Sequence, residues 1–155
     1  MNKKITMEEI IPVFQEVWDR GKSVNFTPSG NSMLPMLRDR QDQVVLSAKN
    51  GKLKKYDLPL FRYNDRYILH RVYKVQRDGT YIMLGDNREA FECGITDDDI
   101  LAVVTSFTRK GKTYSVNNLG YKVYCRFWVG KKKVKWKYYS LKEKIYPYYR
   151  KIFKK

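Results

Sequence analysis

Histidine and cysteine, the residues that most often hold transition metals, are scarce in this sequence. Its 155 residues contain one histidine, His70, and two cysteines, Cys93 and Cys125. A structural zinc site draws on about four such ligands at short spacings, so this set excludes the usual zinc modules. We therefore expect no metal and no cofactor. Nothing in the cysteine spacing requires a disulfide, and a reducing compartment would keep both thiols free.

Long hydrophobic runs are absent as well. The longest run, residues 100–104, is far shorter than the ~18 apolar residues of a membrane span. The N-terminus carries Glu8 and Glu9 in place of the apolar segment of a secretory signal. We therefore expect a cytoplasmic protein, with any membrane contact confined to its periphery.

Acidic residues are nearly missing from the last third of the chain. Residues 1–108 hold 16 Lys/Arg and 15 Asp/Glu, whereas residues 109–155 hold 16 Lys/Arg and a single acid, Glu143. Twelve of the 23 aromatic residues also fall in that second part. The net charge of +16 therefore belongs to a basic, aromatic tail behind a nearly neutral body. We expect three parts: an N-terminal helix over residues 1–22, a body over 23–117 and the tail over 118–155.

A helix is predicted near the N-terminus. Thr6 and Glu9 form a capping box, in which each side chain satisfies a backbone N–H of the other residue. Gly21 is a typical C-terminal stop, and Pro12 predicts a kink or a later start. The apolar residues at helical spacing are Ile10, Val13, Phe14, Val17 and Trp18.

Short segments with strand-like patterns fill the body. Residues 66–76 alternate best, and Asp78-Gly79 then closes a hairpin. Pro59 confines its segment to a sheet edge or a bulge, because proline cannot donate a ladder hydrogen bond. Many short strands at close spacing predict a mainly β fold of the α+β class. The expected strands cover residues 24–27, 43–48, 58–63, 66–76, 80–84, 100–107 and 113–116.

Ser32 lies in a segment that cannot form a regular helix or strand. Gly30 precedes it and Pro35 follows it, and both residue types punctuate loops. Such a loop can present a nucleophile rigidly, but it can also be an ordinary turn. A serine nucleophile needs a base that titrates near neutrality, and His70 on the 66–76 segment is the only histidine. Taken alone, a structural role for His70 is the alternative.

Three short motifs follow one another in a distinctive order. Gly-Asn-Ser-Met-Leu-Pro occupies residues 30–35, Leu-His-Arg-Val occupies 69–72, and Gly-Asp-Asn occupies 85–87. No one of them is specific. Together, in order and in spacing, they resemble the superfamily of signal peptidase I and LexA-type serine peptidases over about residues 24–107. The resemblance implies a signal peptidase/LexA-like β fold with a helix at each end.

The resemblance also implies roles for single residues. Ser32 matches the nucleophile. His70 matches the general base, which is a lysine in the main bacterial signal peptidases and LexA-type proteins and a histidine in the endoplasmic-reticulum and archaeal type. In that second type an aspartate follows the Gly-Asp-Asn turn by several residues; Glu92 falls there, and Asp86 within the turn is the competing candidate. Either carboxylate would orient the imidazole and stabilise its charged form.

The loop around Ser32 departs from the family in one respect. Many bacterial signal peptidases carry a second serine two residues before the nucleophile, and here that position is Gly30. The oxyanion would then depend on backbone N–H groups, chiefly that of Ser32. Asn31, Met33 and Leu34 complete this oxyanion and substrate loop. We expect Met33 and Leu34 to anchor the loop in the core and to line part of the groove.

The implied reaction is peptide hydrolysis by a Ser-His dyad. We expect a serine endopeptidase that acts on a peptide or protein substrate, a leader-like or signal-like peptide with small residues at the cut. The alternative is an inactive peptidase-fold module that binds peptides or an anionic membrane surface. No segment resembles the membrane anchor of signal peptidases, and the Ala-Gly dipeptide that LexA-type repressors cleave does not occur.

Lysines interleaved with tyrosine and tryptophan in the tail suit two surfaces. An anionic membrane attracts the basic groups and accepts aromatic rings at headgroup level, whereas nucleic acid offers phosphates and stacking bases. A helix packed on the body is the third alternative, since residues 140–143 form a second capping box ahead of an apolar stripe. The resemblance favours the membrane surface over nucleic acid.

Overall fold

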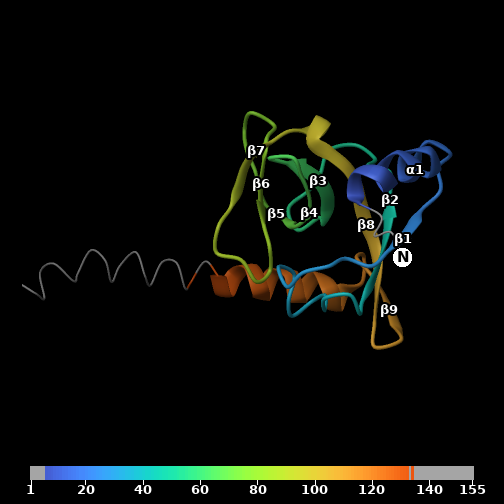
Figure 1. Ribbon diagram of the computed structural model, residues 1–155. Coiled ribbons are helices and arrows are strands. Elements are labelled where there is room, and N and C mark those ends of the chain that lie inside the picture. Colours follow the sequence, from blue (N-terminus) through green and yellow to red (C-terminus); the bar gives the residue numbers. More distant parts are fainter. Residues whose placement is uncertain (1–5, 133, 135–155) are drawn as a thin grey trace, which may run out of the picture.

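The computed structural model describes residues 6–132 and 134 of the chain (Figure 1). Helix α1 (Met7–Asp19) leads into the strands, and a second α-helix over residues 119–132, the C-terminal helix, follows them. The fold is mainly β and belongs to the α+β class, as predicted. Within the described residues, neither helix has the length and apolarity that crossing a bilayer requires. The elements between the helices are β1 (Val24–Phe26), β2 (Gln43–Ser47), β3 (Pro59–Tyr63), β4 (Arg66–Leu69), β5 (Arg71–Val75), β6 (Tyr81–Leu84), β7 (Glu92–Ile95), the 3₁₀ helix η1 (Asp97–Asp99), β8 (Ile100–Arg109) and β9 (Lys112–Ser115).

The strands form two antiparallel sheets. One sheet has the order β1-β2-β8-β3-β4, with β9 paired to β8, and the other has the order β5-β6-β7. The long strand β8 pairs with β2, β3 and β9 and is the spine of the first sheet. The two sheets face each other across the body (Figure 1).

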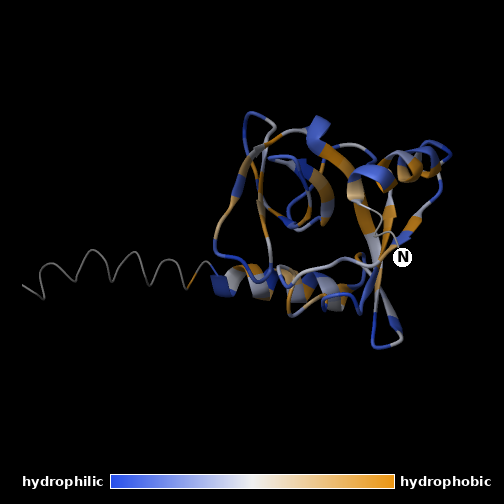
Figure 2. Ribbon diagram, viewed as in Figure 1, coloured by the Kyte–Doolittle hydropathy of each residue, from blue (hydrophilic) through white to orange (hydrophobic). Residues whose placement is uncertain are grey.

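Helix α1 covers one side of the first sheet. Its capping box is confirmed: the Thr6 N–H donates to Glu9 Oε2 at 3.0 Å, and the Glu9 N–H donates to Thr6 Oγ1 at 3.4 Å. Pro12 lies inside the helix, which runs unbroken from Met7 to Asp19. Figure 2 shows that hydrophobic residues recur along α1 and β8, and the buried residues of α1 are Ile11, Phe14 and Trp18. Trp18 donates through Nε1 to the Leu46 carbonyl at 3.2 Å, which fastens α1 to β2.

The predicted strand over residues 66–76 is two strands in two different sheets. It breaks at His70, which lies between β4 and β5. Leu69 packs in the core under α1, whereas Val72 packs in a second core around Phe61. A single straight strand could not contribute side chains to both cores. The alternating pattern therefore predicted one strand where the structure has two.

Strand β3 lies inside the first sheet, so of the two predicted alternatives, a sheet edge or a bulge, the structure does not show the edge. It pairs with β8 on one side and with β4 on the other. Pro59 is the first residue of the strand, where a missing N–H removes little from the ladder. The register with β8 then shifts between Leu60 and Phe61, which is the irregularity that the proline signalled.

The first part of the predicted tail packs against the body. In the C-terminal helix, Tyr121, Cys125 and Val129 recur every four residues and are buried. Cys125 and the exposed Cys93 are both free thiols. The predicted capping box at residues 140–143 and the stripe after it lie outside the described residues.

Arg71, the first residue of β5, is buried at 1% exposure and hydrogen-bonds to four other parts of the chain. Its Nε and Nη2 donate to the two carboxylate oxygens of Asp86 at 2.9 and 2.7 Å. Burial by itself lowers the pKa of Arg71, but the charge and hydrogen bonds of Asp86 more than offset this, so the pKa stays well above its ordinary value. Four further acceptors surround the guanidinium at 3.2, 2.8, 2.8 and 3.1 Å: Tyr56 O, Tyr121 Oη, Cys125 Sγ and Met36 Sδ.

Removing one member of this pair should destabilise the fold strongly. We expect Arg71→Met to lower the free energy of unfolding by about 3–5 kcal/mol, because it leaves the Asp86 carboxylate buried without a counter-charge. The double variant Arg71→Met/Asp86→Leu should recover most of that loss. Urea denaturation measures both, and an Arg71→Met variant as stable as the wild type would contradict this account.

Candidate active site

The serine loop, residues 30–37, is a succession of turns between β1 and β2. The Leu34 N–H donates to Asn31 O at 3.2 Å, and the Leu37 N–H donates to Met33 O at 3.0 Å. Met33 and Leu37 are buried, at 4% and 2% exposure. The hydroxyl-bearing Ser32 is half-buried above them. The loop is therefore anchored in the core on the C-terminal side of Ser32.

Hydrogen bonds to carboxylates and to Arg109 hold this loop and the residues just after it. Gly30 has φ +101°, a conformation that favours glycine, and its N–H donates to Asp39 Oδ1 at 2.6 Å. Beyond the loop, the buried Asp42 accepts from the Arg38 N–H at 2.8 Å and from Arg38 Nη2 at 2.6 Å. Burial raises the pKa of Asp42, and the Arg38 hydrogen bonds outweigh that effect, so its pKa is lowered overall. Arg109 Nη1 also donates to the Pro35 carbonyl.

His70 lies at the junction of the two sheets with one nitrogen already engaged. Its Nδ1 is 2.9 Å from Glu92 Oε2, and the two side chains are only 5% and 12% exposed. The ring also meets Phe61 edge-on, with centroids 6.4 Å apart. A carboxylate on Nδ1 favours the tautomer in which Nδ1 carries the proton and Nε2 is the acceptor. In that tautomer Nε2 can receive a proton.

Gly85 lies between His70 and the serine loop, where there is no room for a side chain. A Cβ atom on Gly85 would lie 2.8 Å from His70 Nε2, 2.8 Å from the Ser32 carbonyl oxygen and 2.7 Å from Arg88 Cγ. His70 Nε2 therefore lies close to the backbone of Ser32. Asn87 ties the same turn to the loop, because its N–H donates to Ser32 O at 2.7 Å and its Nδ2 donates to Asn31 O at 3.2 Å.

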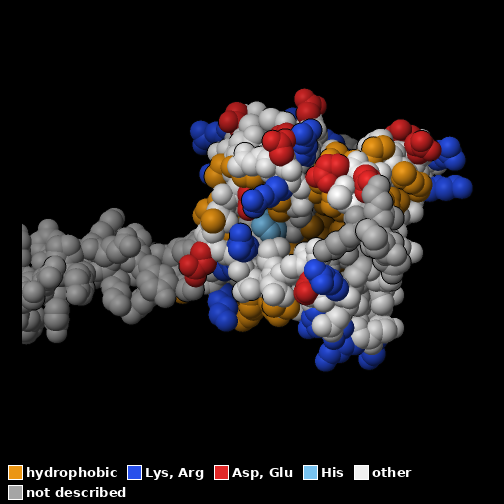
Figure 3. Space-filling model, viewed as in Figure 1, with side chains coloured by type: hydrophobic (Ala, Val, Ile, Leu, Met, Phe, Trp, Pro, Cys, Tyr) orange, Lys and Arg blue, Asp and Glu red, His pale blue; other side chains and the backbone are white. Residues whose placement is uncertain are grey.

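Ser32, His70 and Glu92 line the same cleft, which has a volume of ≈ 450 Å³. Figure 3 shows the histidine in a hollow with Lys and Arg side chains beside it. Among the residues described, no hydrogen bond joins the Ser32 hydroxyl to His70 Nε2, and such bonds often form only with substrate bound. Leu34, predicted for the groove, does not line it. The predicted site residues that do line it are Gly30, Asn31, Ser32, Met33, His70 and Glu92.

Asp86 points away from this cleft. Its carboxylate is bound by Arg71 and also accepts from the Tyr124 hydroxyl at 3.2 Å. Burial raises the pKa of Tyr124, which keeps that hydroxyl protonated as a donor. Of the two carboxylates that the sequence left open, the structure brings Glu92 to His70. Glu92 begins β7, a strand that the sequence pattern did not predict.

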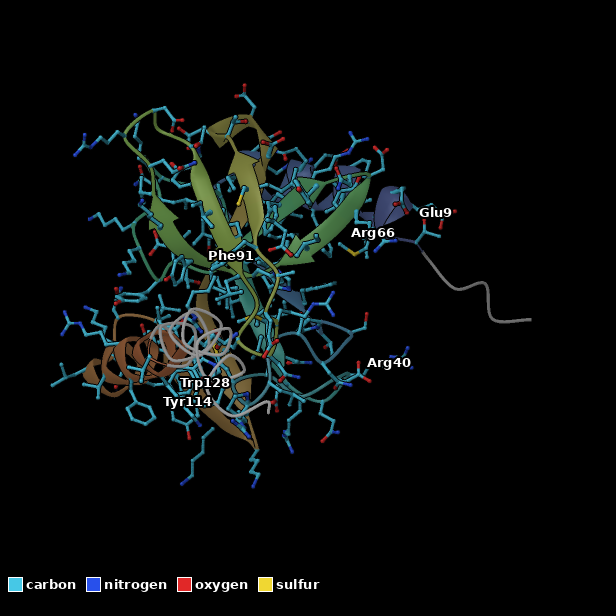
Figure 4. The ribbon with its side chains drawn as sticks, turned by 90° about the vertical axis from the view of Figure 1, so that its left-hand side faces the viewer. Glu9, Arg40, Arg66, Phe91, Tyr114 and Trp128 are labelled. Atoms are coloured by element: carbon cyan, nitrogen blue, oxygen red, sulfur yellow. The ribbon has the colours of Figure 1, made fainter. Side chains whose placement is uncertain are left out.

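The C-terminal helix supports the turn behind the cleft, a contribution that sequence reasoning missed. Trp128 Nε1 donates to Asp86 O at 2.7 Å. Lys132 Nζ donates to Gly85 O at 2.7 Å and to Arg88 O at 2.5 Å. Figure 4 shows Trp128 on this helix, below the three-stranded sheet. Tyr124, Trp128 and Lys132 recur at four-residue spacing, the one local signal that could have suggested a shared face.

Comparison with protein-family models, with curated proteins and with solved structures finds no match to this chain. The activity of the site is therefore inferred from the chemistry of its own residues. It holds a loop serine, a buried imidazole with one nitrogen on a carboxylate, and a cleft that exposes the other nitrogen to the serine loop.

A methyl group added at Gly85 should displace the groups that surround this glycine in the candidate site. We expect Gly85→Ala to cost about 1–3 kcal/mol of unfolding free energy, because His70, Ser32 or Arg88 must move. It should also shift the imidazole proton resonances, which belong to His70 alone in this chain. Gly130→Ala is the matched control: its Cβ would meet nothing within 4 Å on the C-terminal helix, so stability should rise by up to about 1 kcal/mol. Unchanged His70 resonances in Gly85→Ala would contradict the close approach.

Proposed function

We propose that this chain is a serine endopeptidase in which Ser32 is the nucleophile, His70 the general base and Glu92 the orienting carboxylate. The observation that supports it most is the buried contact of 2.9 Å between His70 Nδ1 and Glu92 Oε2. A buried imidazole N–H needs an acceptor in any role, but a carboxylate acceptor in particular also stabilises the imidazolium that a general base forms. Here the partner leaves Nε2 directed toward the cleft that Ser32 also lines.

We further propose that the chain is a small member of the signal peptidase/LexA-like superfamily, of the histidine type. The order of loop serine, histidine and Gly-Asp-Asn turn along the chain supports this. The mainly antiparallel two-sheet body is compatible with it. Glu92 would stand where that type has an aspartate, with an arm one methylene longer.

The reaction that these residues support is acyl transfer. His70 Nε2 takes the proton of the Ser32 hydroxyl while Oγ attacks the carbonyl carbon of the scissile bond. Glu92 stabilises the imidazolium that forms. The imidazolium then returns the proton to the leaving amine, and the acyl group remains on Ser32. Water, deprotonated by His70, releases the acyl group and regenerates the hydroxyl.

The oxyanion of the intermediate would be held by backbone donors. In the described residues, no acceptor takes the Ser32 N–H, so it is available to a developing negative oxygen. Gly30 offers no hydroxyl for this purpose, in contrast to the serine of many bacterial relatives. Backbone N–H groups of the loop would therefore take the place of the side-chain donor that is missing at Gly30.

An extended peptide could approach along β4. This strand ends the order of its sheet, so its outer edge has no strand partner within the described residues. Residues of β4 line the cleft and lead directly to His70. Main-chain pairing with a sheet edge binds peptides largely independently of their sequence. The proposed substrate is a leader-like peptide with small residues at the cut, which the resemblance implies.

Loss of either dyad member should abolish cleavage. We expect Ser32→Ala and His70→Ala each to lower kcat by about 10³–10⁶-fold, because each removes the covalent route. Mass spectrometry of a leader-peptide library measures cleavage, and a serine-directed acylating probe should label Ser32 alone. Ser115→Ala, at an exposed serine on β9, is the matched control and should behave as the wild type.

A different result would favour the alternative function. If wild-type protein binds peptides, cleaves none and leaves the acylating probe unreacted, the chain is an inactive peptidase-fold binding module. Cleavage that persists at the wild-type rate in both variants would refute the Ser32–His70 assignment.

Substitution of Glu92 should impair catalysis, whereas substitution of Asp86 should impair stability. We expect Glu92→Gln to lower kcat by about 10²–10⁴-fold with little change in stability, since it no longer favours the working tautomer. Asp86→Asn should instead lower the free energy of unfolding by about 3 kcal/mol, because Arg71 loses its counter-charge. Kinetics and urea denaturation of both variants give this comparison. A reversed pattern would return the third role to Asp86.

A further inference from the structure

Three arginines line the cleft, and they differ in whether their charge is already neutralised. Arg38 is held by Asp42, with Nη2 at 2.6 Å from Oδ1. Arg66 and Arg88 are exposed and form no ion pair with any described residue. The one carboxylate that lines the cleft, Glu92, is occupied by His70. The charge left free in the cleft is therefore cationic.

Arg88 lines the cleft, and the aliphatic part of its side chain lies close to Gly85, beside His70 and Ser32. Its Cγ is 2.7 Å from the point that a Cβ of Gly85 would occupy, the same point that lies 2.8 Å from His70 Nε2. Its backbone is fixed, because its N–H donates to Gly85 O at 3.0 Å and its carbonyl accepts from Lys132 at 2.5 Å. A fixed backbone with a free guanidinium can meet a substrate side chain next to the cut.

Arg66 lies at the end of β4 that is farther from His70, and β4 is the strand along which the peptide would bind. It begins β4, four positions before His70, so the strand rise of about 3.3 Å per residue separates the two by about 13 Å. That distance equals about four residues of an extended peptide. Figure 4 shows Arg66 near the first turn of α1, where Glu9 is engaged with Thr6.

We propose that this cleft selects acidic peptides, with one carboxylate beside the cut bound by Arg88 and a second about four residues away bound by Arg66. The inference rests on the proposed function, which locates the cut at Ser32. Guanidinium groups pair well with carboxylates and repel basic side chains at the same positions. The net charge of +16 attracts any anion, but it does so without regard to position along the peptide.

The experiment therefore varies position at constant charge. Full-length protein carrying Ser32→Ala binds fluorescent decapeptides of Ala, Ser and Gln, in which a single Glu is moved through every position. We expect two affinity maxima about four residues apart, each about five-fold above the Gln baseline, as modest exposed ion pairs allow. Arg88→Gln should remove the maximum nearest the cut, and Arg66→Gln the distant one.

Arg77→Gln is the matched control, since it removes the same charge from the exposed β5–β6 turn outside the cleft. Both maxima should survive in that variant. A flat Glu scan, or equal losses in all three variants, would overturn acidic selection and leave only the general attraction of a basic protein.

Cleavage by the wild-type chain separates this inference from the proposed function. Two maxima without any cleavage would refute the peptidase and retain acidic recognition. Cleavage of uncharged and Glu-containing decapeptides with equal kcat/KM would retain the peptidase and refute acidic recognition.

Discussion

Arg71 and Asp86 each carry a full charge into the interior, and either charge alone would be costly there. Together they satisfy each other through two hydrogen bonds of 2.9 and 2.7 Å. The pair joins β5 to the turn after β6, and its further contacts reach Met36 in the serine loop and Tyr121 on the C-terminal helix. Four segments far apart in the sequence are thereby held around one buried guanidinium.

The proposed chemistry depends on this pair through the chain itself. His70 immediately precedes Arg71, and Gly85 immediately precedes Asp86. Because the side chains of Arg71 and Asp86 are fixed to each other in the interior, the backbone of His70 and of Gly85, one residue before each, is held in place with them. The C-terminal helix adds Trp128 and Lys132, which bind the carbonyls of the same turn. The buried ion pair and the C-terminal helix together therefore help to set the geometry of the candidate site.

Much of the secondary structure was predictable because its signals are local. The Thr6 capping box, the Asp78-Gly79 hairpin and strand β8 follow from side chains a few residues apart. The errors arose where distant partners decide. Nothing near His70 says that β4 and β5 join different sheets, and Pro59 could not reveal that β8 and β4 would flank β3. The break in the predicted 66–76 strand is also the position of His70, the candidate base.

The sequence by itself determined the candidates: a serine held in a glycine- and proline-bounded loop, the only histidine, and two acids near the Gly-Asp-Asn turn. Turn chemistry and residue type are local properties, so they can be read without a fold. Only the tertiary structure decided between the acids. Asp86 is pulled inward by Arg71, and β7 pairs with β6 in a register that brings Glu92 to His70. That choice, and the support from the C-terminal helix, depend on contacts across 15 to 47 residues of chain, which no local pattern encodes.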